Sequence, residues 1–239
     1  MKEQYLRGAR FLADNIDCPE QYPFSLPAFR ALSALDFHPH VTFIVGENGT
    51  GKSTLLEAIA IAWGFNPEGG TRNFQFSTCN SHSNLHEYLR LIRGVRKPSD
   101  GFFLRAETFY NVSTQIDDLG VACFYGGKSL HQQSHGEAFF AAFMHKFRGN
   151  GLYILDEPEA ALSPMRQMAI LSRIHDLVRA KSQFIIATHS PIIMSYPNAA
   201  ILEITAQGIA LTEYEKTEHY MIMKEFMNNY RKMLRILVE

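Results

Sequence analysis

The fold is decided by a glycine-rich stretch and by what flanks it: Gly46-Glu47-Asn48-Gly49-Thr50-Gly51-Lys52-Ser53-Thr54. The stretch matches G-x-x-x-x-G-K-[ST], a loop whose backbone N–H groups surround phosphate groups. Residues 41–45 before it are β-branched or aromatic and predict a buried strand. Residues 54–63 predict a buried helix that ends near Gly64. Strand, loop and helix in this order are the context that the motif requires.

The side chains of this loop suit a nucleotide and a magnesium ion. In such loops the lysine, here Lys52, reaches the β- and γ-phosphates, and the hydroxyl of Ser53 ligates Mg²⁺. The helix that begins near Lys52 adds the positive end of its dipole. The alternative is a glycine-rich turn that arose by chance, which the flanking strand and helix disfavour. We therefore expect residues 46–54 to bind the nucleotide.

A second apolar strand ends in two carboxylates. Residues 152–155 predict a buried strand, and Asp156 and Glu157 follow it directly. At the carboxyl end of a strand beside the phosphate loop, Asp156 would hold Mg²⁺ through its water shell. Glu157 would then polarise the attacking water. The alternative is a polar strand end without a catalytic role. Glu159 is a weaker candidate because it lies beyond Pro158.

The segment Ser134-His135-Gly136-Glu137 precedes an apolar stretch, 138–147, that predicts a buried helix. Two interpretations stay open. Ser134 and Glu137 have the spacing of a capping box, which only closes the helix start. A helix N-terminus in which Gly136 leaves room for a ligand would instead bind a phosphate.

A third predicted strand, residues 184–187, leads to His189. At a strand end in this series, the imidazole of His189 is placed to contact a γ-phosphate or the attacking water.

The remaining segments predict further strands and helices of one α/β domain. Strands that alternate with helices predict a largely parallel sheet. Residues 84–107 read as a helix or as a hairpin that turns at 98–101, and the hairpin is favoured. Ser163 and Pro164 begin a helix to about 180, and 201–204 with 209–211 predict a terminal hairpin. Residues 217–239 predict an amphipathic helix, for which docking on its own domain is favoured over docking on a partner.

Composition excludes several classes of protein. The 239 residues are 46% apolar and 20% charged, which excludes wholesale disorder. A net charge of −1 excludes a uniformly basic nucleic-acid coat. The 3 cysteines are far apart, so a disulfide framework is not expected. No apolar run suggests a membrane span or a secretory signal, and we expect a cytoplasmic protein.

Taken together, these segments resemble the ATP-binding cassette (ABC) ATPase head over about residues 40–205. The Walker A motif (46–54), signature (134–137), Walker B motif (152–157), D-loop (around 160–163) and switch His189 follow in the order of that family. The segments 156–164 and 188–191 look like the soluble AAA-type predicted ATPases, which are similar to the OLD, RecF and SMC/Rad50 heads. Unlike some of those heads, this sequence has no long coiled coil between the Walker motifs and no Toprim domain after residue 205.

The resemblance implies an α/β fold of the P-loop NTPase type, with a mostly parallel sheet, an antiparallel β subdomain and a helical lobe. We expect one domain over 1–239, with the helical or insert lobe at about 75–147 and the C-terminal helix at about 217–239. Two heads would sandwich two ATP molecules, so that the signature of one copy (Ser134, His135, Gly136, Glu137) faces the γ-phosphate held by the other. Glu107 is the candidate for the Q-loop residue.

The expected function is Mg²⁺-dependent hydrolysis of ATP to ADP and phosphate by a homodimer, with Glu157 and His189 catalytic. Coupling to DNA metabolism or phage defence, through a nucleic acid or an effector protein, is the favoured setting. One alternative is the nucleotide-binding subunit of an ABC transporter, although transporter heads usually show Ser-Gly-Gly-Gln at the signature. A slow ATP-dependent binding switch is the other alternative.

Two weaker signals remain. Cys79, His82 and His86 resemble part of a zinc pattern, which lacks a fourth ligand nearby. A basic stretch could touch nucleic-acid phosphates, although a solvated face is favoured. Its residues are Arg90, Arg93, Arg96, Lys97 and Arg105.

Overall fold

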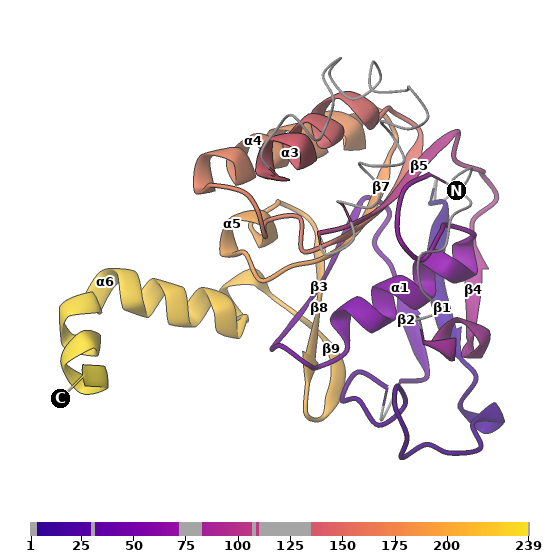
Figure 1. The fold of residues 1–239 in the computed structure, drawn as a ribbon, viewed down its shortest axis with the longest axis horizontal. Coiled ribbons are helices and arrows are strands. Elements are labelled where there is room, and N and C mark those ends of the chain that lie inside the picture. The colour runs from indigo at the N-terminus through magenta and orange to yellow at the C-terminus, as the bar shows by residue number, and fades with distance from the viewer. Residues whose placement is uncertain (1–3, 30–31, 72–82, 107–108, 110–134, 239) are drawn as a thin grey trace.

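Two β-sheets with a helix between them form the centre of the molecule (Figure 1). The computed structural model describes residues 4–29, 32–71, 83–106, 109 and 135–238. The larger sheet has 6 strands in the order β5-β6-β7-β3-β8-β9, and the smaller has 3 in the order β2-β1-β4. The strands are β1 (Leu6–Phe11), β2 (Ala34–Asp36), β3 (Val41–Gly46), β4 (Leu89–Arg93), β5 (Asp100–Arg105), β6 (Gly151–Asp156), β7 (Gln183–Ala187), β8 (Ala200–Thr205) and β9 (Gly208–Thr212).

The larger sheet is parallel except at one edge. β3 pairs in parallel with β7 on one side and with β8 on the other, and the β5-β6 and β6-β7 pairs are also parallel. Only β9 runs antiparallel, to β8, which confirms the predicted terminal hairpin. The smaller sheet is antiparallel throughout. The predicted fold class, a mostly parallel sheet with an antiparallel β subdomain, is therefore confirmed.

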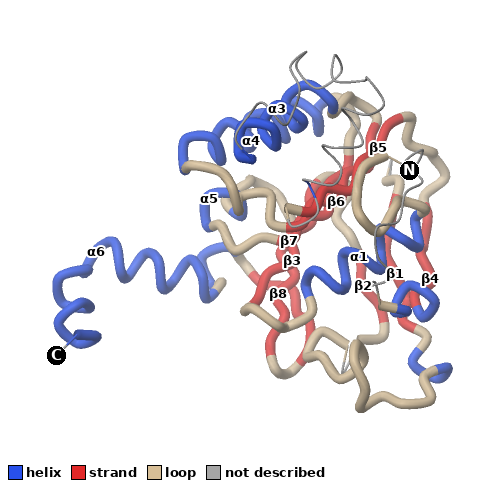
Figure 2. The backbone as a smooth tube through the Cα atoms, in the orientation of Figure 1, coloured by secondary structure: helices blue, strands red, loops and turns tan. Residues whose placement is uncertain are grey.

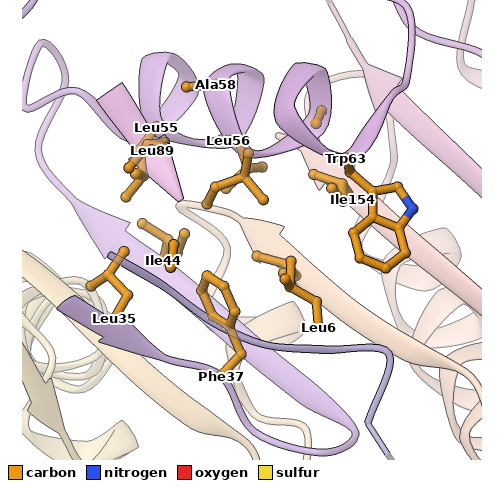
Figure 3. Close-up of a cluster of buried hydrophobic side chains, with 14 of the residues drawn as sticks. Leu6, Leu35, Phe37, Ile44, Leu55, Leu56, Ala58, Trp63, Leu89 and Ile154 are labelled. Atoms are coloured by element: carbon orange, nitrogen blue, oxygen red, sulfur yellow. The ribbon is translucent and has the colours of Figure 1, made fainter. Parts of the chain in front are cut away.

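The helix after the phosphate loop, α1 (Lys52–Trp63), lies between the two sheets. Its side chains Leu55, Leu56 and Ile59 are completely buried, and Figure 3 shows the first two packed among residues from both sheets. A helix covered on both sides must be apolar around its circumference, which is why the sequence predicted a buried helix. Gly64 ends it in the left-handed conformation at φ 107°, which confirms the predicted end.

Further helices cover the other face of the larger sheet (Figure 2). Along β3, Val41, Phe43 and Val45 face these helices, whereas Ile44 faces α1. Both faces of the strand are buried, which explains its continuous apolar sequence. The helices are α3 (His135–Lys146), α4 (Pro164–Arg179) and α5 (Pro191–Met194), followed by α6 (Glu218–Val238) near the C-terminus; the single 3-10 turns are Ala13–Asn15, Asn84–Tyr88 and Tyr214–Lys216.

One buried amide side chain joins the two sheets. Gln183, the first residue of β7, accepts hydrogen bonds through Oε1 from the backbone N–H of Tyr5 (3.1 Å) and of Leu6 (2.9 Å). Its Nε2 donates to the carbonyl oxygens of Leu6 (2.7 Å) and His38 (3.0 Å). Gln183 therefore satisfies backbone groups at the start of β1 that the sheet leaves without a partner.

The predicted hairpin over 84–107 is wrong. β4 and β5 are both strands, but β4 pairs with β1 in the smaller sheet and β5 pairs with β6 in the larger one. Phe102, Phe103 and Leu104 of β5 are buried on both faces, which a strand at the edge of a sheet covered by helices on both faces allows and an isolated hairpin does not. Residues 89–93 and 100–105 therefore belong to the sheets, although they fall in the range expected for a helical or insert lobe.

The expected docking of the C-terminal helix is also wrong. α6 leads away from the sheets (Figure 1), and none of its residues is buried. Ile222, Met227 and Leu237 are 56%, 70% and 71% exposed. Non-helical backbone at Asn229 (φ −129°) divides the helix. An amphipathic pattern indicates that one face of a helix is apolar, but it does not indicate which surface, if any, covers that face. The docking of α6 therefore could not be predicted from its sequence.

Among the helices that the structure describes, none combines the length and apolar character needed to cross a lipid bilayer.

The link through Gln183 predicts a large stability effect. Gln183→Leu keeps the volume but leaves the N–H groups of Tyr5 and Leu6 without an acceptor, so we expect a loss of about 3 kcal/mol in the free energy of unfolding. Denaturant unfolding measures this loss. The matched control is Gln207→Leu in the exposed β8-β9 turn, which should change stability by less than about 0.5 kcal/mol. Equal effects in both variants would contradict the role of Gln183.

Candidate functional site

Three parallel strands of the larger sheet end side by side, and each end carries predicted site residues. Ile44 of β3 and Asp156 of β6 both lie opposite Ala187, the last residue of β7. The phosphate loop follows β3, Glu157 follows β6 and His189 follows β7 by two residues. Carboxyl ends of parallel strands are where open α/β sheets form their sites.

The phosphate loop has the backbone that its glycines allow. Gly46, Gly49 and Gly51 have φ of 146°, 78° and 103°. A Cβ at Gly49 would find nothing within 4 Å, so the space over the loop is open, and Gly51 provides the left-handed residue from which α1 begins. The loop residues Glu47, Asn48 and Gly49 are exposed at its rim, Thr50 and Thr54 are half-buried, and the Oγ1 of Thr50 donates to the carbonyl of Glu47 (2.8 Å).

Lys52 lies inside the curve of this loop. Its Nζ donates to the carbonyl oxygens of Gly46 and Glu47, both at 2.9 Å, and the residue is buried. Burial lowers the pKa of Lys52, and the carboxylates of Glu157 and Asp156 oppose that shift. An ammonium group held by two carbonyls in an open loop is a suitable partner for a phosphate anion.

Ser53 and Asp156 form a pair of oxygen donors. The Oγ of Ser53 donates to Oδ1 of Asp156 at 3.1 Å, and Asp156 is only 4% exposed. A hydroxyl and a carboxylate are hard oxygen ligands, which Mg²⁺ prefers. The two residues that the sequence predicted as magnesium ligands are therefore adjacent, although they are 103 positions apart.

A charged pair next to Asp156 was not predicted. Nε of Arg105 lies 3.7 Å from Oδ2 of Asp156, and its Nη1 bonds to the buried Glu57 of α1. Arg105 is the last residue of β5 and lies opposite Asp156 in the register of β5 with β6. The sequence signal that could have found it is its position at the end of an apolar strand. Arg105 thus belongs to the site rather than to the exposed basic stretch.

Glu157 has an unusual backbone. Its φ is +49°, in the left-handed region that non-glycine residues rarely adopt, and its N–H donates to the carbonyl of Ala187 at 3.0 Å. Its side chain is 40% exposed, and Oε1 lies 3.6 Å from Nε2 of His189. This backbone conformation turns the chain directly after the strand and leaves the carboxylate accessible at the sheet edge. Such outliers concentrate at functional sites.

Glu159, ranked as the weaker candidate, holds the end of β7. Its Oε1 accepts hydrogen bonds from the backbone N–H of His189 (2.6 Å) and of Ser190 (3.2 Å). Burial raises the pKa of this carboxyl group, and the hydrogen bond from His189 opposes the shift. The position of the His189 backbone therefore depends on Glu159.

The imidazole of His189 is neutral at neutral pH. Burial, assisted by Lys52 and His219, lowers its pKa from 6.5 to about 4. Its contact with Glu157 is consequently not an ion pair under ordinary conditions. Its Nδ1 lies 2.8 Å from Nε2 of His219 on α6, a neighbour that the sequence analysis did not identify.

The signature segment contacts a different part of the chain. Ser134 and the Q-loop candidate Glu107 lie outside the described residues, and His135 begins α3. A Cβ on Gly136 would lie 2.2 Å from the carbonyl oxygen of Ala161, and Glu137 bonds to Arg166 at 3.5 Å. Packing against the backbone of Ala161 is therefore a sufficient reason for a glycine at position 136, and the contact with a ligand stays a prediction.

The weaker sequence signals do not form a site among the described residues. Arg90, Arg93, Arg96 and Lys97 are exposed, and Arg93 lies over the ring of Trp63 at 4.6 Å, whereas Arg105 is bound to Glu57 and so is separate from them. Cys79 and His82 lie outside the described residues, and the ring of His86 pairs with the carbonyl of Ser83 at 3.2 Å. Within the part of the chain that is described, no group of three or more His, Cys, Asp or Glu side chains is arranged to hold a metal ion.

Two family models match the sequence, and both are AAA domains. Residues 26–111 match "AAA domain", and residues 129–195 match "AAA domain, putative AbiEii toxin, Type IV TA system". The matched segments contain the phosphate loop, Asp156, Glu157 and His189. A comparison with curated protein sequences gives no match.

A solved structure shares the fold. cbiO1 from Clostridium perfringens, part of the ABC transporter complex cbiONQ, is 18% identical with a TM-score of 0.52, and the match covers 98% of this chain and 100% of that chain. The SMC head domain from Thermotoga maritima is 16% identical with a TM-score of 0.46, and the match covers 88% of this chain and 100% of that chain. At such identities the likeness concerns the fold alone.

The contact at Gly136 predicts a cost for any side chain there. Gly136→Ala places a methyl group against the carbonyl of Ala161, so α3 or the D-loop must move, and we expect about 1–3 kcal/mol of destabilisation. Thermal unfolding measures it. Glu137→Ala is the neighbouring control, because its contact with Arg166 is exposed and should contribute less than about 1 kcal/mol. Wild-type stability of Gly136→Ala would show that the two backbones are not in contact.

The low pKa of His189 predicts a pH effect on stability. Between pH 6.5 and about 4 the unfolded chain binds a proton at His189 and the folded chain does not, so stability falls as the pH falls through this window. The contribution to the slope is at most about 1.4 kcal/mol per pH unit. Denaturant unfolding from pH 7 to 4.5 should give a shallower slope for His189→Gln. Gln207→Leu, which removes no titratable group from the exposed β8-β9 turn, should keep the wild-type slope.

Proposed function

We propose that this AAA-type ATPase domain, which has the fold of ABC ATPase heads, binds ATP with Mg²⁺ and hydrolyses it to ADP and phosphate. The observation that carries the proposal is the convergence of Lys52, Ser53, Asp156, Glu157 and His189. They come from three separate segments and lie around one open phosphate loop. Nucleotide binding requires the phosphate loop alone. Hydrolysis also requires a group that activates water, and the exposed carboxylate of Glu157 with the neutral imidazole of His189 beside it can do this.

The residues present fit ATP and Mg²⁺. Ser53 and Asp156 would hold the metal ion, and loop N–H groups with Lys52 would hold the phosphates. When bound, Mg²⁺–ATP supplies the electrophilic γ-phosphorus and neutralises charge that develops on its oxygens. Lys52, which donates to the carbonyls of Gly46 and Glu47 without nucleotide, would donate to phosphate oxygens when ATP is bound. Arg105 orients Asp156 through their contact at 3.7 Å.

Glu157 and His189 act on the attacking water. The accessible carboxylate of Glu157 accepts a proton from the attacking water, which increases the nucleophilicity of the oxygen. His189, being neutral, offers one N–H donor without adding a positive charge that would pair with Glu157 and weaken it as a base. Glu159 keeps His189 in place by accepting a hydrogen bond from the backbone N–H of His189.

We further propose a head-to-tail homodimer in which the signature of one copy (Ser134, His135, Gly136, Glu137) acts on ATP held by the other. Gly136 packs against the backbone of Ala161, and Glu137 bonds to Arg166 at the start of α4. The proposal rests on the resemblance of residues 134–137 to the signature of ABC ATPase heads, in which two heads enclose two ATP molecules. The domain would then act as one unit over residues 1–239.

The setting of the ATPase rests on weaker support. The family description that matches residues 129–195 names a toxin–antitoxin system, which favours phage defence, with an effector protein or nucleic acid as partner, over general DNA metabolism. The transporter alternative predicts instead a stable complex with membrane subunits in the native host. A reproducible complex of that kind would overturn the defence setting, and the cytoplasmic location expected from the sequence stays a prediction.

Glu157→Gln tests the proposal. It removes the proton acceptor and keeps the shape, so we expect ATP turnover to fall by about 10²–10⁴-fold with ATP binding retained. In ATP the variant should elute as a dimer, because the intact γ-phosphate stays between the heads. Glu213→Gln, at an exposed carboxylate that pairs with Lys216, is the matched control and should keep wild-type turnover.

Lys52→Ala separates binding from hydrolysis. Without the ammonium inside the loop, ATP affinity should be lost, measured by equilibrium binding of a fluorescent ATP analogue. Unchanged affinity would remove Lys52 from the nucleotide site. Slow turnover in the wild type, unchanged in Glu157→Gln, would instead indicate the binding switch.

A further inference from the structure

His219 approaches the site from the C-terminal helix. It is the second residue of α6, and its Nε2 lies 2.8 Å from Nδ1 of His189, with ring centroids 5.0 Å apart. The two rings face a cavity of about 210 Å³ whose lining also includes Glu47 of the phosphate loop and Pro191 of α5. A residue on the last helix thus contacts the predicted switch histidine at the border of the phosphate loop.

The start of α6 is fixed to the body, although the remainder of the helix is exposed. Thr217 directly before it is completely buried, and its Oγ1 donates to the carbonyl of Tyr214 at 2.7 Å. The N–H of Glu218 donates to Glu203 of β8 at 3.3 Å, and the hydroxyl of Tyr214 donates to the carbonyl of Pro191 at 2.8 Å. The position of His219 relative to His189 is therefore set by β8 and α5.

A hydrogen bond between two neutral imidazoles needs one N–H and one lone pair. Nε2 of His189 lies 3.6 Å from the carboxylate of Glu157, which is an acceptor, so a proton on this nitrogen is favoured and a lone pair would be repelled. Nε2 of His189 is buried and makes no hydrogen bond in the described structure, so the carboxylate of Glu157 at 3.6 Å is an ionic neighbour rather than a bonded partner. With the proton on Nε2, Nδ1 of His189 is the acceptor, and Nε2 of His219 must be the donor.

We propose that His219 is a positioning residue: by donating from its Nε2 to Nδ1 of His189, it fixes the tautomer in which the Nε2–H of His189 points to Glu157 and the phosphate side of the site. The catalytic consequence rests on the proposed ATPase function. Without this donor, Nδ1 of His189 could hold the proton itself, and Nε2 would present a lone pair to the carboxylate and to the phosphate oxygens. That tautomer has no donor on the side where the reaction takes place.

The test begins with the full-length wild type and no nucleotide. The chain is labelled with ¹⁵N-histidine, and His189 is assigned by comparison with His189→Gln. We expect the chemical shifts of a protonated Nε2 and an unprotonated Nδ1 for His189. The opposite tautomer in the wild type would overturn the proposal without any variant of His219.

Variants of His219 then separate the donor from the bulk of the ring. His219→Phe keeps an aromatic ring without a donor, and His219→Gln keeps an N–H donor without the ring. We expect a mixture of His189 tautomers in His219→Phe and the wild-type tautomer in His219→Gln. His175→Gln on α4 is the control for histidine replacement at an exposed position and should change nothing.

Turnover gives the second readout. His219→Phe should lower kcat by roughly 10–100-fold, the range for partners that orient a functional histidine. The KM for ATP should change less than about twofold, because Lys52 and the loop still hold the phosphates. His219→Gln should recover most of the rate. Melting temperatures of all variants are compared, and His219→Met replaces His219→Phe if the latter does not fold.

The outcomes distinguish this inference from the proposed function. An active wild type whose His219→Phe variant keeps both rate and tautomer would overturn the role of His219 and leave the ATPase intact. Equal rate losses in the Phe and Gln variants, with the tautomer unchanged, would overturn it in favour of simple packing. A wild type without ATPase would overturn the proposed function, whereas the tautomer comparison would still decide the contact.

Discussion

The burial of α1 between two sheets is the constraint on which the rest of the structure depends. Lys52 and Ser53 are the first two residues of this helix, so any freedom of α1 would be freedom of the phosphate loop. The larger sheet covers one side of the helix and the smaller sheet the other, and Gln183 joins the two sheets through backbone groups of β1. The packing of α1 between the two sheets, together with the link through Gln183, therefore determines how rigidly the phosphate loop can hold an anion.

The sequence predicted the elements that are defined by short continuous apolar runs. β3, β6, β7 and α1 all lie where predicted, because residues buried on both faces leave a clear local pattern. The pairing of β4 and β5 was not predictable in this way, since strand pairing is a choice between distant partners and the local pattern is equally compatible with a hairpin. The predicted docking of α6 was wrong for a related reason. The amphipathic pattern shows that one face of the helix is apolar, but it does not show whether another surface covers that face.

In the site, too, the sequence predicted the residues that have a local pattern and not those that depend on distant contacts. Lys52, Ser53, Asp156, Glu157 and His189 were found because each lies in or beside a motif at a strand end. Arg105, Glu57 and His219 were missed because their contacts depend on strand register and on the place where the C-terminal helix begins. Glu159 was named only as a weaker candidate, because its contact with the backbone of His189 is not visible in the sequence. Gly136 shows a third case, in which the residue was identified and its close neighbour, the carbonyl of Ala161, was not.

Arg105, Glu159 and His219 act on the orientation of groups that the motifs supply. Arg105 contacts the predicted metal ligand, Glu159 holds the backbone of His189, and His219 faces its ring. Motif residues specify which chemistry is available, whereas these partners determine the direction and protonation of each group. Because His219 belongs to a helix whose remaining surface is exposed, the orientation of His189 is the point where events on α6 would reach the site. The pair of imidazoles is therefore a contact through which the accessible helix α6 reaches the catalytic side of the site.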